Sequence, residues 1–177
     1  MTTTTSSPGR QFTELTLPGV SIGLGSGLIA GAVALLGGLS ATYALATALT
    51  LGIPLAAFGL GYYVLLARGK VPLGVAAPAV GYWLICFPLA RLLHEVSFDI
   101  VSGTRISLPD AVLPFLAFQV LVGVGYGIGF MWITEHVFPH WWIRIRDHNP
   151  VAQRYVDHYI AQTATTQLRA EHKKRQP

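Results

Sequence analysis

Charge is scarce in this sequence. Of its 177 residues, 11% are charged and 52% are hydrophobic, and the mean hydropathy is +0.51. Soluble domains carry about 25% charged residues, and disordered chains carry few apolar ones. The composition therefore excludes a soluble enzyme and a disordered protein, and it indicates an integral membrane protein. Cysteine is scarcer still: Cys86 is the only one, which excludes a disulfide-rich secreted scaffold and intramolecular disulfide exchange.

The missing charges define long neutral tracts. Lys, Arg, Asp, Glu and His are all absent from residues 15–67, 71–90 and 111–134. One membrane-crossing helix needs roughly 20 apolar residues, so the first tract is long enough for two crossings with a turn between them. The small residues Gly-Gly-Leu-Ser at positions 37–40 provide that turn.

These tracts predict an all-α fold, an integral membrane bundle of four helices. A membrane β-barrel is disfavoured because its strands alternate apolar and polar residues over about ten positions, whereas these tracts are apolar on every side. A signal peptide cleaved near Ala46 is also disfavoured, because the apolar run continues past that point and Arg10 is the only cation before it. The four helices are expected at about residues 18–38, 41–67, 71–93 and 111–133.

The positions of Lys and Arg predict the orientation. Of the twelve, only Arg91 and Arg105 lie on the side opposite the chain ends. Cationic loops stay in the cytoplasm, so both termini are expected there, with residues 1–17 as a mobile cytoplasmic segment. The small-residue-rich helices and the absence of organelle signals favour a prokaryotic cell membrane. The pI of about 9.5 reflects the basic tail, which suits anionic lipid headgroups; no nucleic acid partner is expected.

Glycines recur at a spacing of four in the first and fourth predicted helices. This spacing places small residues on one helix face, where another helix can approach closely. Two interpretations stay open: packing against a helix of the same chain, which we favour, or a seam with a second copy or another subunit. The run in the fourth helix is no nucleotide-binding loop, because position 128 is Ile and no strand precedes it. The predicted packing residues are Gly19, Gly23, Gly27 and Gly31 in the first helix, and Gly123, Gly125, Gly127 and Gly129 in the fourth.

Three polar side chains lie at similar depth inside the neutral tracts: Thr50, Tyr82 and Gln119. A polar group in lipid needs a hydrogen-bonding partner. We therefore expect these residues to bond one helix to another, with a ligand site as the alternative.

Two further segments carry structural signals. Residues 94–110, on the expected outer side, alternate apolar and polar residues around Ser102-Gly103 and predict a short β-hairpin. Residues 134–177 are expected to form an interfacial anchor and then a basic, amphipathic cytoplasmic helix, with Asn149 as its N-cap and Pro150 as its first residue. That helix suits either the membrane surface or a partner protein. The anchor residues are Trp141, Trp142, Arg144 and Arg146.

One pair of histidines, His136 and His140, has the spacing of two metal ligands on a helix. Four helices with cytoplasmic histidines resemble membrane di-iron hydroxylases and desaturases in outline. Those families need several histidine boxes, whereas this chain has a single pair with Pro139 inside it. We therefore expect no metal and no cofactor, and we interpret these histidines as interfacial residues.

These features predict a multi-pass membrane protein without catalysis of its own, which serves as an accessory, assembly or anchoring component of a membrane complex. No carboxylate lies inside a neutral tract, which argues against ion-coupled transport. The expected partners are the lipid bilayer and other membrane subunits, or a second copy, met through the glycine faces. Two other functions stay open: a small transporter or channel for a neutral or lipidic solute, and a metal-dependent lipid-modifying enzyme.

Overall fold

The neutral tracts are largely helical in the computed structural model, which describes residues 7–161 apart from residues 73, 107 and 110. Four helices are long and apolar enough to cross a membrane, as the sequence predicts. They are α1 (Pro8–Leu36), α2 (Ala41–Ala67), α3 (Ala76–Ser102) and α4 (Val112–His136). A short helix α5 (Pro139–Ile145) follows, and a last helix begins at Pro150 and continues to residue 161. Within the described residues, the prediction of an all-α fold with four long apolar helices is confirmed.

The predicted turn between α1 and α2 is also confirmed. Gly38 adopts a φ of 83°, a left-handed conformation that side chains disfavour, and this reverses the chain. The hydroxyl of Ser40 then accepts a hydrogen bond from the backbone N–H of Tyr43 at 3.2 Å, which caps the start of α2.

Three helix ends differ clearly from the predicted ones. α1 begins ten residues before the expected start, so residues 8–17 of the predicted mobile segment are helical, and residues 1–6 lie outside the described residues. The early start is favoured by Pro8, whose fixed φ suits the first turn of a helix. α3 starts later than expected, at Ala76, and its end at Ser102 lies beyond the predicted one.

The predicted outer β-hairpin is not supported. The first half of that segment continues α3 as far as Ser102, and the described residues from 103 to 111 form a loop without a strand. The helix continues because its side chains find partners at helical spacing: Arg91 pairs with Glu95 at 2.7 Å, and the ring of Phe98 packs against that of Tyr43. Gly103, with a φ of 68°, then ends the helix.

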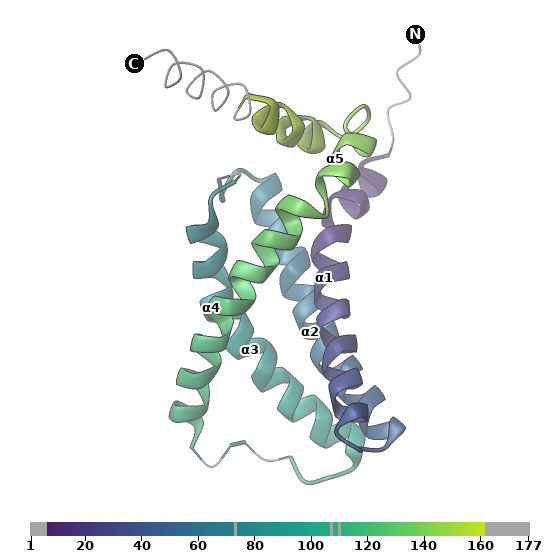
Figure 1. Ribbon diagram of the computed structural model, residues 1–177, viewed down its shortest axis with the longest axis vertical. Coiled ribbons are helices and arrows are strands. Elements are labelled where there is room, and N and C mark those ends of the chain that lie inside the picture. The colour runs from purple at the N-terminus through teal and green to yellow at the C-terminus, as the bar shows by residue number, and fades with distance from the viewer. Residues whose placement is uncertain (1–6, 73, 107, 110, 162–177) are drawn as a thin grey trace, which may run out of the picture.

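The four long helices pack as two antiparallel pairs (Figure 1). α1 lies along α2, while α3 and α4 cross each other, and contacts between α2 and α3 join the two pairs. Both α5 and the helix of residues 150–161 lie at the end of the bundle where α1 begins, which we call the capped end. The opposite end, where the turn at 37–40 and the loop at 103–111 lie, we call the far end.

Aromatic rings fill the core near the capped end. The side chains of Tyr62, Tyr63, Trp83, Phe130 and Trp142 are each at most 1% exposed. Their rings meet edge-on or tilted, with centroids 5.2 Å apart for Tyr62 and Phe130 and 5.8 Å apart for Tyr63 and Trp142. Each such pair contributes about 0.5–1.5 kcal/mol beyond the area it buries, so this cluster fixes α2, α3, α4 and α5 together.

Candidate functional site

The glycines of α1 lie against small residues of α2. Gly19 faces Gly59, Gly23 faces Ala56, Gly27 faces Gly52, and Gly31 faces Ala44 and Ala48. An added Cβ at each of these four glycines would come within 3 Å of α2 atoms, most of them in the backbone. This glycine face is therefore covered within the same chain, in the arrangement favoured from the sequence.

The glycines of α4 divide into two faces. Gly123 and Gly127 lie against Trp83 and its neighbours on α3; a Cβ on Gly123 would come 2.8 Å from the carbonyl oxygen of Trp83. Gly125 and Gly129 lie on another face, and a Cβ on either would have no described atom within 4 Å apart from the backbone of α4 itself. The first face is used to cross α3, and the second stays open.

The polar residues predicted inside the tracts differ in their surroundings. Thr50 is buried beside His94, with 2.8 Å between its hydroxyl and Nδ1 of the imidazole. Tyr82 donates its hydroxyl to the backbone oxygen of Phe58 at 2.7 Å. Gln119 is 7% exposed, yet its side chain makes no hydrogen bond within the described part of the chain. Two of the three thus join α2 to α3, and the third does not join helices.

Sequence reasoning missed three partners inside the bundle. Besides His94, these are Ser26, whose hydroxyl lies 3.3 Å from that of Tyr126, and Thr134, whose hydroxyl lies 3.1 Å from that of Tyr63. These pairs tie α4 to α1 and to α2. In a helix, the hydroxyl of Ser or Thr often donates to the backbone carbonyl four residues earlier, as those of Ser26 and Thr134 do. The sequence therefore does not indicate that either hydroxyl has a second partner on another helix.

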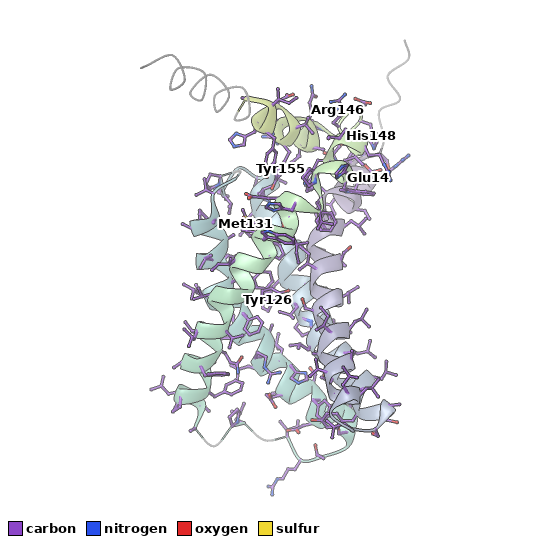
Figure 2. The ribbon with its side chains drawn as sticks, viewed as in Figure 1. Glu14, Tyr126, Met131, Arg146, His148 and Tyr155 are labelled. Atoms are coloured by element: carbon purple, nitrogen blue, oxygen red, sulfur yellow. The ribbon has the colours of Figure 1, made fainter. Side chains whose placement is uncertain are left out.

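A polar cluster at the capped end joins α1 to the segment after α4. The carboxylate of Glu14 lies 2.9 Å from Nε2 of His148, and Trp141 donates its indole N–H to the backbone oxygen of Glu14 at 3.0 Å. Figure 2 shows Glu14 and His148 close together at this end. Gln11 donates to the backbone oxygen of His148, and Asn149 donates to the backbone oxygen of Gln11, each at 2.9 Å. We call these five residues the clasp.

The predicted anchor residues take different positions. Trp142 is 1% exposed and stacks on Tyr155 at 4.8 Å, so its ring lies in the core rather than at a surface. Trp141 is partly buried in the clasp, whereas Arg144 and Arg146 are exposed. The difference arises because α5 folds back onto the bundle and presents one side inward.

The predicted histidine pair does not converge with other ligands. His136 stacks on Trp132 at 4.8 Å, with Nδ1 2.9 Å from that residue's carbonyl oxygen, and His140 is exposed. Pro139 begins a new helix between them, which breaks the i,i+4 register of the pair. Among the described residues, no group of three His, Cys, Asp or Glu side chains is arranged to hold a metal ion.

Burial changes the acidity of two tyrosines in the last helix. It raises the pKa of the Tyr155 hydroxyl well above its ordinary value of 10.0, and nearby tyrosines and Glu135 raise it further. Burial, with a smaller contribution from the negative charge of Glu135, raises the pKa of Tyr159 to about 12. Both hydroxyls therefore stay protonated at neutral pH and are able to donate hydrogen bonds.

No protein-family model, curated protein or solved structure matches this chain significantly.

Proposed function

We propose that this protein is a multi-pass integral membrane protein that acts as a non-catalytic accessory, assembly or anchoring component of a membrane complex. Four long helices with mean hydropathies of 1.4 to 1.9 support the membrane location. The bias of Lys and Arg supports an orientation with the capped end in the cytoplasm. The small-residue-rich helices favour a prokaryotic cell membrane.

Polar contacts inside the bundle support a structural role. Thr50 bonds with His94, and Tyr63 bonds with Thr134, in each case between two helices. Interhelical hydrogen bonds of this kind stabilise membrane bundles by about 0.6–1.7 kcal/mol each. The buried polar groups in these pairs are therefore used to hold helices together.

The observation that carries the proposal is the uncovered face of α4. Of the apolar 18-residue stretch of α4, only 17% is buried by the rest of the chain, whereas 50% of the corresponding stretch of α2 is buried. On this face Gly125 and Gly129 are one turn apart, with no described atom within 4 Å of a Cβ placed on either. Three large apolar side chains, those of Leu121, Ile128 and Trp132, are each more than half exposed on α4.

A transmembrane helix of another subunit would occupy this face. Without side chains at Gly125 and Gly129, a second helix backbone approaches closely and gains dispersion contacts that flexible lipid chains provide less well. Glycine in a helix interior costs about 1 kcal/mol relative to alanine, and close helix contact offsets this cost. The neighbouring pair Gly123 and Gly127 already serves in this way against α3.

Purification in a mild detergent followed by mass spectrometry tests the proposal. We expect a stoichiometric membrane partner to copurify with the wild type, and we expect it to be lost from the Gly125→Leu/Gly129→Leu variant. Gly81→Leu is the matched control, since Gly81 on α3 is also exposed with open space around its Cβ position. A monodisperse wild-type protein without a partner, or equal loss in the control, would contradict the proposal.

A further inference from the structure

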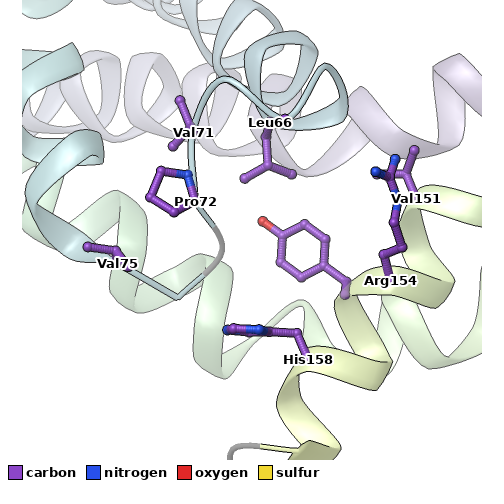
Figure 3. A pocket seen from close by; sticks show the side chains of 9 residues that line it. Leu66, Val71, Pro72, Val75, Val151, Arg154 and His158 are labelled. Carbon is purple, nitrogen blue, oxygen red and sulfur yellow. The ribbon is translucent and has the colours of Figure 1, made fainter.

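A cavity of about 420 Å³ lies at the capped end between the α2–α3 loop and the last helix. Its volume is in the range of sites for small molecules, about 300–1,000 Å³. Figure 3 shows the loop residues Val71, Pro72 and Val75 across from Val151, Arg154 and His158 of the last helix. The complete lining is Leu66, Gly69, Val71, Pro72, Val75, Val151, Arg154, Tyr155 and His158.

The position of the cavity matches the border between hydrocarbon and water. Leu66 belongs to the last turn of α2, and Val75 immediately precedes α3, so the cavity lies where two apolar helices end. At this depth a bilayer presents lipid headgroups and the glycerol ester region. A site here would meet lipid before it meets a soluble molecule.

The lining is amphiphilic and, among the residues that the structure describes, contains no carboxylate. Leu66, the loop residues and Val151 provide apolar walls, whereas Arg154 and His158 provide the nitrogen-bearing groups. Arg154 is exposed and forms no ion pair within the described ranges. Arg68 and Lys70 belong to the same loop and add positive charge near the cavity. The negative charge of Glu135 also acts on Tyr155, but it is the last of the contributions to that residue's raised pKa. The cations at the cavity outnumber it, so the site suits an anion.

A hydroxyl group without a partner completes the lining. Tyr155 is 2% exposed, and stacking on Trp142 at 4.8 Å fixes its ring. Its hydroxyl makes no hydrogen bond to any residue that the structure describes. Like any tyrosine hydroxyl, it is protonated at neutral pH, and it lines the same cavity as Arg154, so it is able to donate a hydrogen bond there. This hydroxyl borders the cavity, so an oxygen of a bound ligand is able to accept its hydrogen bond.

We propose that this cavity binds the phosphate-bearing headgroup of an anionic phospholipid from the adjacent membrane leaflet. The guanidinium of Arg154 pairs with the phosphate, the hydroxyl of Tyr155 donates to one of its oxygens, and the apolar walls cover the glycerol esters and the first acyl carbons. A free phosphate ion would gain nothing from these walls, which is why a lipid fits better. The proposal rests on the membrane location proposed above.

Titration of dioleoylphosphatidylglycerol into the detergent-solubilised protein, read by native mass spectrometry, tests the site. We expect one high-affinity lipid per chain, bound more tightly than dioleoylphosphatidylcholine. Arg154→Gln and Tyr155→Phe should each weaken it about tenfold, the usual effect of removing one hydrogen bond to a charged group. Tyr155→Phe keeps the stacked ring, so the fold is preserved. Arg144→Gln removes the same charge from an exposed position outside the lining and should change little.

A variant that keeps every charge distinguishes lipid binding in the cavity from lipid binding to a basic surface. Val75→Trp fills the space from the loop side and should abolish the high-affinity lipid, although no cation is lost. Equal weakening by Arg144→Gln, unchanged binding in Val75→Trp, or no preference over phosphatidylcholine would overturn the proposal. Displacement of the lipid by millimolar inorganic phosphate would overturn it in favour of a soluble anion. Loss of the partner in Gly125→Leu/Gly129→Leu is a separate readout, so the two proposals fail independently.

Discussion

Replacing Gly23 with alanine is expected to destabilise the bundle, because α1 and α2 touch through their backbones at this point. An added Cβ would overlap the backbone N of Ala56 and lie 2.5 Å from the carbonyl carbon of Leu55. Carbon atoms in contact are about 3.5–4.0 Å apart, so the two helices would have to separate by about 1 Å here.

The size of the effect follows from that separation. A gap of 0.5–1 Å removes roughly a quarter to a half of the dispersion energy of each contact it opens, and overpacking costs about 1–3 kcal/mol. We therefore expect Gly23→Ala to lower the free energy of unfolding by about 2 kcal/mol. Gly25 is two residues further along α1 and faces another side of the helix, with no described atom outside the helix's own backbone within 4 Å of its Cβ position. Gly25→Ala should therefore stabilise by up to about 1 kcal/mol through helix propensity.

Unfolding by sodium dodecyl sulfate in dodecyl maltoside micelles, followed by far-ultraviolet circular dichroism, measures both variants. We expect the unfolding free energy to change in opposite directions for these two identical substitutions, which are two residues apart. If Gly23→Ala left the unfolding free energy unchanged, or if Gly25→Ala lowered it equally, α1 would not approach α2 closely along this face.

Three other predictions use the same measurement. Thr50→Val should lower the unfolding free energy by about 1 kcal/mol because it removes a hydrogen bond between helices. Gln119→Leu should leave the unfolding free energy unchanged or higher because the amide bonds to no other helix. The reverse order of the two variants would refute both statements. Glu14→Gln should lower it by about 1 kcal/mol by weakening the contact with His148, and should increase amide exchange at the start of α1, while unchanged exchange would count against the clasp. The pKa of Tyr159 is about 12 in the folded chain and its ordinary value is 10.0. The stability contributed by its neutral hydroxyl is therefore full below pH 10 and is lost as the pH rises towards 12. Tyr159→Phe should reduce the fall of the unfolding free energy over this pH range, and an equal fall in variant and wild type would contradict the assignment.

The number of long helices could be predicted because charged residues are absent from three long tracts of the sequence. The tracts without charge locate α1 to α4, and Gly38 marks the first turn as expected. The cap of the last helix was also readable: Oδ1 of Asn149 accepts hydrogen bonds from the backbone N–H groups of Val151 and Ala152. These features depend on residues that are close together in the sequence, which is why the sequence alone predicts them.

The ends of helices were less accessible to such reasoning. A helix that extends past the hydrocarbon carries polar residues, and its pattern there resembles a surface loop or strand. Residues 96–101 alternate as a strand would, yet packing of Phe98 on Tyr43 and the contact of His94 with Thr50 keep them helical. Such partners belong to another helix, and the pattern of residues within the segment does not indicate them.

The candidate site was mostly beyond prediction for the same reason. The cavity near Arg154 exists because the last helix turns back over the α2–α3 loop, and neither segment indicates the other in the sequence. Trp142 looked like an interfacial anchor because tryptophan beside arginine favours headgroups. Its burial against Tyr155 depends on the direction of α5, which the spacing of residues alone does not determine.

The clasp also sets an order of events during synthesis. Gln11 bonds to His148 and Asn149, which are 137 and 138 positions away, whereas α1 and α2 are neighbours along the chain. At ribosomal rates of about 5–20 residues per second, the first turns of α1 wait on the order of ten seconds for these residues to emerge. The first helix pair is thus able to assemble early, while closure of the start of α1 waits for translation of the residues near position 149.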